Sequence, residues 1–449
     1  MIRIRTIALL AGLACAAAAP TAAAAGTFGV MHPFVGPPTD GEYPQAGLIL
    51  NGSDLYGTTF GSLSDTPGKH CSKSCGNVYG LINSEGEPQM IHAFGSGENG
   101  DSDGSFPTSE VTLNPANGFL YGTTEYGVGN GCGGLGCGTF YKVSSDGSTE
   151  KAYKFCLLAA CADGVFPHGS LALDANGRLY GVAMGGGTGA GWLCGSSFGG
   201  CGTVYQVTAG GPRPIYSFCK TPQNNVCTDG AVPYGGLVAD EAKNLYGTTQ
   251  FGGVNLGGTV FKVTSAGVLT VLHSFCAQGD CAADGAVPQT TMIISNGNLF
   301  GTTTYGGNVC QQRQGCGVVF RMALDGTGFA VLHRFSGGQE GALPMAPVLA
   351  DGSGNLYGTT LRGGVGTCGR GSLKLGCGTL YQLPAAGGTL TTLHAFNDTD
   401  GVHPQGRLAL ENGVLYGVTR DQGDPVCLCG TLYKYALATA APKVAMPLH

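Results

Sequence analysis

Charged side chains, tryptophan and long apolar runs are all scarce in this chain of 449 residues. Asp, Glu, Lys and Arg together make up 11% of the residues, against roughly 25% in typical soluble domains. No basic run is present, which argues against a nucleic-acid partner because such binding needs clustered Lys and Arg. Beyond the N-terminal segment no stretch approaches about 18 apolar residues, so we expect no membrane-spanning helix. Sustained 3.6-residue periodicity is also missing, which indicates that helices are rare.

Glycine is abundant instead, and much of it belongs to a motif that recurs seven times. The chain contains 82 glycines. The motif LYGTT, or a close variant, begins at Leu55, Leu120, Leu179, Leu245, Leu299, Leu356 and Leu415. Successive copies are 54 to 66 residues apart, which is long enough for four short strands and one long loop. Because self-similar units usually stack into one continuous body, we expect one domain rather than several.

Each repeat carries four strand-like segments. In the repeat around Leu245 they are about GLVAD, NLYGTT, GTVFKV and VLHSF, denoted strands a, b, c and d. Such segments, rich in Val, Leu, Tyr, Phe and Thr and bounded by Gly, Asn, Asp or Pro, are typical of β-strands. Strands b and c are apolar on both faces, as Tyr246, Val260 and Phe261 show, which fits sheets packed between neighbouring sheets. The pattern predicts an all-β, seven-bladed β-propeller with four antiparallel strands per blade.

The two ends of the repeat region predict how the ring closes. The segment TFGVMHPF contains His32 and Phe34, which match His273 and Phe275 of strand d. The last repeat ends with its strands b and c, LYGVT and CGTLYKY, and has no strand d of its own. We therefore expect the N-terminal strand to complete the last blade, which removes the open sheet edges. The propeller should span residues 26–436, followed by a disordered tail over residues 437–449.

Residues 1–25 have the pattern of a secretory signal peptide and are not expected to belong to the fold. Arg3 and Arg5 precede a short apolar stretch, and Ala23 and Ala25 offer a small-residue cleavage site. A lipoprotein cleavage site ending at Cys15 is the weaker alternative. Cleavage makes the net charge of −6 two units more negative. The mature protein is therefore expected to be secreted, in an extracellular or periplasmic location.

The cysteines that remain after cleavage fall into near-neighbour pairs along the chain. Strand connections alternate between the two ends of a propeller, so the d–a and b–c loops share one face, termed the loop face and taken as the candidate working surface. The b–c loops carry Cys71/Cys75, Cys132/Cys137, Cys194/Cys201, Cys310/Cys316, Cys368/Cys377 and Cys427/Cys429, and the d–a loops carry Cys156/Cys161, Cys219/Cys227 and Cys276/Cys281. An even count in an exported chain predicts disulfides. Zinc is the competing interpretation, but no CxxC pair occurs. So small a ring makes the pairing of Cys427 with Cys429 the least certain.

The repeat pattern F…DGxxPxxxL…GNLYGTTxxGG…GCGTVFKV…LHxF resembles the GloVer tandem-repeat family of extracellular bacterial proteins. The resemblance covers essentially the whole mature chain, from about Phe28 to Tyr435. It implies a secreted or surface-attached repeat protein whose biochemical role is generally undefined. Members often carry a C-terminal anchor, which this sequence does not show. The family offers no catalytic residues to carry over.

The acidic residue of the DGxxP motif has two possible roles. The segments GDSDG at 100–104 and NDTDG at 397–401 faintly resemble calcium loops. Calcium needs six to eight oxygen ligands, and most of these loops offer one Asp, which more simply holds the turn ahead of Pro. We therefore expect no metal or other cofactor, with calcium only weakly supported.

Candidate binding residues stand where the repeats disagree. The residue after the DGxxP proline begins the innermost strand near the mouth of the central channel, and the seven copies have Gln45, Thr108, His168, Tyr234, Gln289, Met345 and Gln405. Two positions further along, Glu110 and Arg407 are charged where other repeats have Gly, Ser, Thr or Pro. The b–c loops add Glu125, Tyr126, Trp192, Phe251, Tyr305, Arg362, Arg420 and Asp421. Together they predict a polar and aromatic rim around the channel mouth.

Two classes of function remain open at this point. In the first, the chain is a monomeric recognition or scaffold module that binds an extracellular glycan or protein through the rim. In the second, it is a polysaccharide-active enzyme, a glycosidase or a lyase acting on uronic-acid polysaccharide. A lyase would need a base, an acid and a cation for the substrate carboxylate. His168 and Tyr234 could supply the first two, and Arg362, Arg407 or Arg420 the third.

Overall fold

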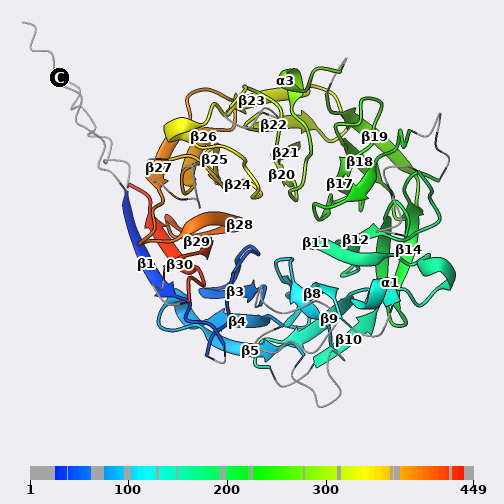
Figure 1. Cartoon of the computed structure of the whole chain (residues 1–449), viewed down its shortest axis with the longest axis horizontal. Helices are drawn as coiled ribbons and strands as arrows, with labels where there is room; N and C mark the ends of the chain where they lie inside the picture. The colour runs from blue at the N-terminus through cyan, green and yellow to red at the C-terminus, as the bar shows by residue number, and fades with distance from the viewer. Residues whose placement is uncertain are drawn as a thin grey trace, which may run out of the picture.

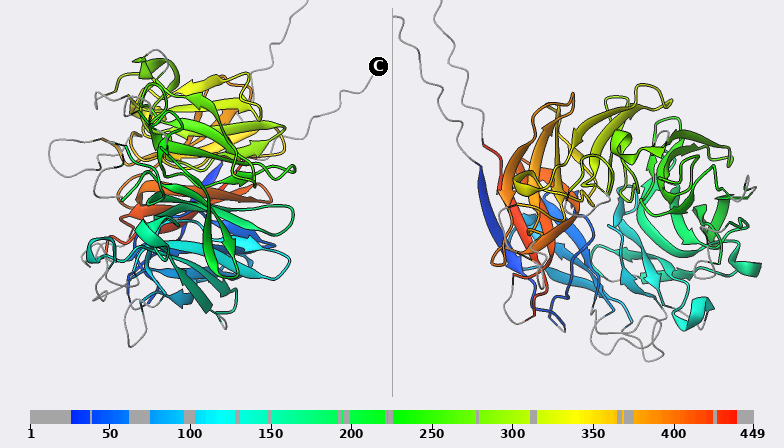
Figure 2. Two further views of the ribbon diagram at one scale, coloured as in Figure 1. Left: turned by 90° about the vertical axis from the view of Figure 1, so that its right-hand side faces the viewer. Right: turned by 45° about the horizontal axis from the view of Figure 1, so that its top comes forward.

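The seven copies of the repeat form seven antiparallel β-sheets, arranged as blades around a central axis (Figure 1). Figure 2 shows the same ring from two further directions. The predicted seven-bladed propeller is therefore confirmed. The computed structural model describes residues 26–37, 39–61, 75–95, 103–127, 131–147, 150–191, 194, 199–220, 222, 226–276, 279–310, 315–364, 368, 375–423 and 427–438. The proposed signal peptide and most of the expected tail lie outside these residues.

The strands of each blade are given from the axis outwards. Blade 1 consists of β2 (Ile49–Asn51), β3 (Asp54–Thr59), β4 (Asn77–Leu81) and β5 (Gln89–Ala93). Blade 2 consists of β6 (Ser105–Pro107) with β7 (Thr112–Asn114), then β8 (Phe119–Tyr126), β9 (Thr139–Ser144) and β10 (Glu150–Lys154). Blade 3 consists of β11 (Val165–Leu173), β12 (Leu179–Gly185), β13 (Thr203–Thr208) and β14 (Gly211–Ser217).

The remaining four blades follow the same order. Blade 4 consists of β15 (Ala231–Pro233) with β16 (Val238–Ala239), then β17 (Leu245–Phe251), β18 (Thr259–Val263) and β19 (Leu269–Ser274). Blade 5 consists of β20 (Ile293–Ser295), β21 (Asn298–Thr303), β22 (Val318–Ala323) and β23 (Ala330–Arg334). Blade 6 consists of β24 (Leu349–Ala350), β25 (Asn355–Thr360), β26 (Thr379–Pro384) and β27 (Thr391–Ala395). Blade 7 consists of β28 (Val402–Glu411), β29 (Val414–Asp421), β30 (Thr431–Ala436) and β1 (Thr27–Pro33).

The N-terminal strand closes the ring, as the ends of the repeat region predict. β1 pairs antiparallel with β30, from Thr27 opposite Ala436 to Pro33 opposite Thr431. In Figure 1 the blue β1 lies along the outer edge of the red β30. Both ends of the repeat region therefore contribute strands to the sheet of blade 7. This shared sheet closes the ring.

Three residues of LYGTT have clear packing roles in the blade. The leucine is buried in all seven copies. The glycine leaves room for an aromatic ring of strand c, since a Cβ on Gly122 would lie 2.3 Å from the Tyr141 hydroxyl oxygen. The hydroxyl of the second threonine bonds that of the threonine opening strand c, as between Thr124 and Thr139 at 2.8 Å. Blades 4, 6 and 7 repeat this bond. The motif recurs because the blades share most of these contacts.

One aromatic pair crosses every interface between blades. The Phe that ends strand d packs edge-on against a Tyr or Phe in strand c of the next blade, with ring centroids 4.8 to 5.4 Å apart. The pairs are Phe34–Tyr79, Phe94–Tyr141, Phe155–Tyr205, Phe218–Phe261, Phe275–Phe320, Phe335–Tyr381 and Phe396–Tyr433. Such pairs contribute about 0.5–1.5 kcal/mol each beyond area burial. Because Phe34 directly follows β1, the closing interface matches the other six.

The DGxxP motif joins each blade to the preceding one. Its acidic side chain accepts hydrogen bonds from the turn, as Asp400 does from the Asn397 amide at 2.7 Å and from His394 at 2.8 Å. The residue before the proline has a left-handed φ of 56° to 59° in every blade, which is uncommon for a residue other than glycine. This conformation aims its N–H at a carbonyl of the preceding blade, as His403 donates to Cys377 at 2.9 Å.

The innermost strand differs from the expected GLVAD segment. In blade 4 it begins within the DGxxP motif, as β15, and is interrupted before β16. Between these strands the Leu237 amide donates to the Ser170 carbonyl of blade 3 at 3.1 Å. The two blades approach so closely that a Cβ on Gly236 would lie 2.2 Å from the Ser170 nitrogen. The backbone therefore bulges toward its neighbour, and bulges redirect nearby side chains.

Disulfides join eight of the nine predicted cysteine pairs. The ninth prediction, Cys71 with Cys75, lies outside the described residues because Cys71 does. The bonded pairs include Cys427–Cys429, the least certain one. All eight disulfides lie in b–c or d–a connections, which places them on the loop face.

The Cys310–Cys316 disulfide, which was predicted, is partly buried. Cys316 is bonded to Cys310 as predicted, but it is 0% exposed and belongs to the core cluster around Phe335 and Leu343. The physical reason is that its carbonyl accepts a hydrogen bond from the Leu343 amide of the next blade at 2.8 Å. Cys316 therefore lies in the interface between blades 5 and 6, whereas Cys310 is partly exposed.

The second cysteine of every b–c pair has this buried position. Each is at most 5% exposed, and its carbonyl accepts from the pre-proline amide of the following blade. The residues are Cys75, Cys137, Cys201, Cys316, Cys377 and Cys429. The second cysteine of each pair thus fastens its b–c loop to a blade interface.

Helix is confined to short turns in the part of the chain that the structure describes. These are α1 (Gly131–Gly134), α3 (Cys281–Asp284), η1 (Ile82–Ser84), η2 (Ala159–Cys161) and η5 (Gly338–Glu340). Among these described residues no helix has the length and apolar character needed to cross a membrane.

Candidate functional site

A cavity of about 350 Å³ lies on the axis of the ring at the loop face. Its wall contains the residue after the DGxxP proline from every blade, namely Gln45, Thr108, His168, Tyr234, Gln289, Met345 and Gln405. Glu110, Glu125, Arg407 and Arg420 line the same cavity. The bulged inner strands thus bring seven equivalent but chemically different positions to one place. We term this cavity the axial cavity.

A connected set of polar side chains forms the floor of the axial cavity. Glu110 of blade 2 pairs with Arg407 of blade 7, with 3.4 Å between Oε1 and Nη1. The Ser170 hydroxyl of blade 3 donates to Glu110 Oε1 at 2.5 Å and lies 3.2 Å from the Thr291 hydroxyl of blade 5. Thr291 in turn accepts from the Gly236 amide of blade 4 at 2.9 Å. Side chains from several blades are therefore coupled across the channel.

The same floor separates the axial cavity from a second one. A cavity of about 570 Å³, lined by the a–b halves of the inner strands of blades 1 to 4, also contacts Glu110, Ser170 and Arg407. These three residues lie between the two cavities. The axial cavity therefore has a polar floor.

The rings of His168 and Tyr234 lie next to each other in the cavity wall. Their rings lie 3.9 Å apart, and His168 Nδ1 is 2.9 Å from the Tyr234 carbonyl oxygen. Burial lowers the pKa of His168, partly offset by Glu125. Burial, with Glu125, raises the pKa of Tyr234 to about 12. Both side chains are therefore neutral at pH 7.

Carboxamide groups provide much of the polar wall. Gln45, Gln289 and Gln405 come from blades 1, 5 and 7 and line the cavity together. The Gln289 carbonyl oxygen accepts a hydrogen bond from the Thr304 hydroxyl at 2.9 Å, so the amino group is the part of this carboxamide that the bond does not use. Planar carboxamides offer both donors and acceptors to a polar ligand.

A cluster of charged residues forms the rim beside blade 7. Asp421 Oδ2 accepts from Arg420 Nε at 2.9 Å and lies 2.6 Å from His403 Nδ1. Burial lowers the pKa of Arg362, and the positive charge of Arg420 lowers it further. Arg420 is among the residues that line the axial cavity, and Arg362 is not.

Three other predicted rim residues stand apart from the axial cavity. Tyr126 packs between Phe106 and Phe166, with centroids 6.2 and 5.5 Å away. Tyr305 lines a separate cavity of about 550 Å³ together with Phe251. Trp192 lies outside the described residues. The predicted rim residues that the structure describes therefore lie on several surfaces. Most of them line the axial cavity.

Ser170 and Thr291 belong to the cavity but were not among the predicted site residues. They occupy the position of Glu110 and Arg407 in their own repeats, three residues after the DGxxP proline. Inspection of charge alone overlooks them because a hydroxyl residue at a variable position gives no distinctive signal. The comparison of this position among the seven repeats contains both residues, but only the fold shows that their hydroxyl groups meet Glu110 and each other.

These features define a disulfide-linked tandem-repeat β-propeller with a polar axial cavity. The chain belongs to the Gloeobacter/Verrucomicrobia repeat family, whose model matches residues 66–311, 190–373 and 312–448. This confirms the resemblance seen in the repeat pattern. No curated protein matches the sequence.

Solved structures share the propeller fold at low sequence identity. The GH74 enzyme of Niastella koreensis is 15% identical with a TM-score of 0.50, over 88% of this chain and 53% of that chain. The β-propeller domain of the Trilobed protease from Pyrococcus furiosus is 7% identical with a TM-score of 0.46, over 88% of this chain and 95% of that chain. At 15% identity the likeness to the GH74 enzyme shows the fold alone.

Proposed function

We propose that the protein is a secreted recognition module that binds a glycan in the axial cavity. The observation that carries this proposal is the convergence of the seven post-proline residues on one cavity. Other motif positions keep the same residue types because each blade needs the same packing. This position varies, and most of its residues offer hydroxyl, imidazole or carboxamide groups.

The chemistry of the cavity suits a polyhydroxylated ligand. Gln45, Gln289 and Gln405 supply donors and acceptors, and the adjacent rings of His168 and Tyr234 supply a less polar surface. A volume of about 350 Å³ is within the usual range for small-ligand pockets. The disulfides fit an oxidising, extracytoplasmic location, where such a module would meet glycans.

Binding to the axial cavity can be tested by a glycan array followed by calorimetry on the chain that starts at residue 26. We expect His168→Ala and Gln289→Ala each to weaken binding about fivefold, as the loss of about 1 kcal/mol from a stacking or hydrogen-bond contact implies. Lys243→Ala is the matched control because Lys243 lies in the a–b turn of blade 4, at the opposite face. Binding that depends on Lys243 but not on His168 would contradict the proposal.

A polysaccharide lyase is the second candidate because His168, Tyr234, Glu110 and Arg407 line the same cavity. A Tyr234 pKa of about 12 lies far from neutral, whereas efficient general acids and bases titrate near the working pH. A lowered pKa also makes His168 a weaker base. These shifts favour binding over catalysis. Release of ultraviolet-absorbing unsaturated uronates from a polysaccharide would support the lyase instead.

A further inference from the structure

A cavity of about 550 Å³ lies on the loop face between blades 4 and 5 and is separate from the axial cavity. We term it the blade 4–5 cavity. Its wall comes from the end of β17, the connection from β19 to β20 and the connection from β21 to β22. Phe251 and Tyr305 line it from the same position of two consecutive repeats, six residues after the leucine of the motif. Aromatic rings of two neighbouring blades therefore belong to one cavity.

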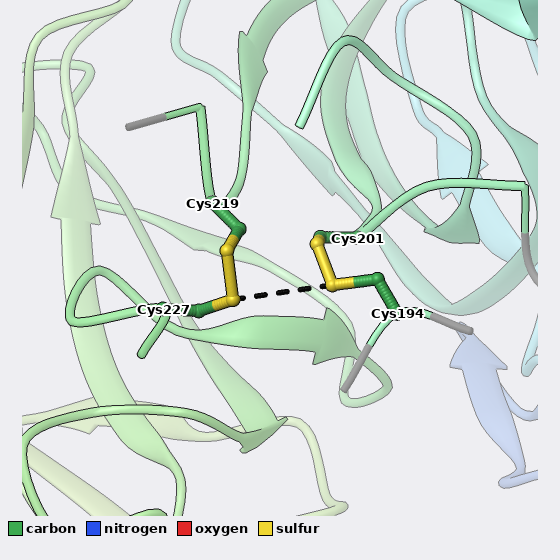
Figure 3. Close-up of side chains that lie close together, drawn as sticks. All are labelled: Cys194, Cys201, Cys219 and Cys227. Atoms are coloured by element: carbon green, nitrogen blue, oxygen red, sulfur yellow. Dashed lines mark hydrogen bonds between the residues drawn. A yellow bond between two sulfur atoms is a disulfide. The ribbon is translucent and has the colours of Figure 1, made fainter. Parts of the chain in front are cut away.

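The short b–c connection of blade 4 leaves this position open. In blades 3 and 4, a disulfide of the b–c connection packs against a disulfide of the d–a connection (Figure 3), and Cys194 Sγ lies 3.9 Å from Cys227 Sγ. The b–c connection of blade 4, residues 252–258, is shorter and contains no cysteine. The next d–a disulfide, Cys276–Cys281, therefore meets no b–c disulfide of blade 4, and Cys281 lines the cavity instead.

The two rings of the blade 4–5 cavity lack the aromatic neighbours that the same repeat position has in blade 2. There Tyr126 packs between Phe106 and Phe166, which precede the DGxxP prolines of blades 2 and 3. In blade 5 the residue before this proline is Val287, which also lines the cavity. A valine fills less space beside a ring than a phenylalanine does. Each of the two rings packs against a core cluster and also lines the cavity, so part of each ring is available to a ligand.

Polar groups with unused hydrogen-bonding capacity line the same cavity. Within the described part of the chain, the Tyr305 hydroxyl group and the Gln250 carboxamide make no hydrogen bond. Asp280 accepts a hydrogen bond from the Ala282 amide through Oδ1, at 2.9 Å, so its second carboxylate oxygen is not used by this bond. The cavity therefore combines aromatic surface with a hydroxyl group, a carboxamide and a carboxylate.

We propose that the blade 4–5 cavity is a second sugar-binding subsite, so that the protein binds a chain of several sugars rather than a single sugar. A sugar ring has a face of C–H groups and an edge of hydroxyl groups. Phe251 and Tyr305 provide aromatic surface for the face. Asp280 and Gln250 provide acceptors and donors for the edge. The inference rests on the proposed glycan binding in the axial cavity, because the second subsite extends that binding along the same ligand.

The two cavities are close enough for one glycan to occupy both. Val287 lines the blade 4–5 cavity, and Gln289, two residues later, lines the axial cavity. Two residues span at most about 7 Å of backbone. The Thr304 hydroxyl donates to Gln289, and the next residue, Tyr305, lines the blade 4–5 cavity. A glycan chain that fills the axial cavity therefore has the second cavity within its reach.

Chain length provides the test, because only a longer glycan reaches both cavities. Calorimetry on the chain from residue 26 can use cello-oligosaccharides, oligogalacturonates and chito-oligosaccharides, each of two and of six sugars. In a series that binds, we expect six sugars to bind about fivefold more tightly than two, as one further stacking contact implies. Phe251→Ala and Tyr305→Ala should each weaken six-sugar binding about fivefold, a greater loss than for two sugars. Val254→Ala is the matched control, since Val254 is exposed and lines neither cavity.

A milder variant separates loss of stacking from loss of folding. Phe251→Leu keeps an apolar side chain against the core and removes the flat ring, so it should melt close to the wild type and still weaken six-sugar binding. Equal affinity for two and six sugars, or six-sugar binding that Phe251→Leu and Tyr305→Ala leave unchanged, would overturn the second subsite alone. Absence of binding in all three series, or binding that His168→Ala does not weaken, would contradict the proposed function and the subsite together.

Discussion

At the scale of single residues, the aromatic position of strand c is the clearest case of an unpaired polar group. Tyr79, Tyr141, Tyr205, Tyr381 and Tyr433 are fully buried, and within the described residues their hydroxyl groups have no hydrogen-bond partner. Blades 4 and 5 have Phe261 and Phe320 at the same position. The ring therefore supplies the packing in every blade, and the hydroxyl group adds only a desolvation cost.

This reasoning predicts the effect of removing one hydroxyl group. We expect Tyr205→Phe to leave the free energy of unfolding unchanged or to raise it by about 1 kcal/mol, because a buried unsatisfied donor is lost. Tyr246→Phe is the control, since its hydroxyl donates to Asp240 at 2.9 Å, and it should lose about 1 kcal/mol. Urea unfolding of both variants measures the difference. A greater loss for Tyr205→Phe than for Tyr246→Phe would show that its hydroxyl group is bonded.

At the scale of one blade, the glycine of the DGxxP motif allows this turn to pack closely against strands b and c. In blade 2 a Cβ on Gly104 would lie 2.0 Å from the Thr124 hydroxyl oxygen and 2.6 Å from that of Thr139. These are the two hydroxyl groups that bond each other across the blade. The same glycine approaches the equivalent threonines in other blades, as Gly401 does Thr419. The turn and the sheet therefore pack without room for a Cβ atom between them.

Substitution of this glycine should be far more costly than substitution of a glycine in a turn. Gly104→Ala combines a φ of +104° with a steric clash, so we expect a loss of about 3 kcal/mol or more in unfolding free energy. Gly118→Ala has a φ of +73° and nothing within 4 Å of its Cβ, so only the backbone term of about 1 kcal/mol applies. Thermal unfolding of the two variants compares them. Similar losses would mean that backbone strain alone governs both.

At this scale the sequence predicts more of the fold than of the site. Strands b, c and d follow from their residue types, and the post-proline position could be placed near the axis because repeats occupy equivalent places. The bulge of the inner strand could not be predicted, since Leu237 bonds to Ser170 in another blade. The contact of Glu110 with Arg407 and Ser170 was missed for the same reason. Such contacts depend on distances across the ring, which no local pattern encodes.

At the scale of the whole molecule, seven similar interfaces form a closed ring. Six are between blades built from consecutive segments of chain, and the seventh depends on β1 pairing with β30 and on Phe34 packing against Tyr79. Loss of the seventh interface would open the ring and expose the facing surfaces of blades 7 and 1. The free-energy cost of breaking this interface therefore falls on both the first and the last blade.

Removal of the closing strand tests whether closure stabilises the entire ring. We expect deletion of residues 26–34 to lower the melting temperature of the whole protein, because it exposes the edge of β30 and the face around Tyr79. A circular permutant that joins residues 437 and 26 through a linker and opens the chain in the turn near Asn176 keeps β1 paired and is the control. It should melt close to the wild type and as one transition. If the deletion variant melts like the permutant, or if only blade 7 unfolds early, closure does not stabilise the ring as a unit.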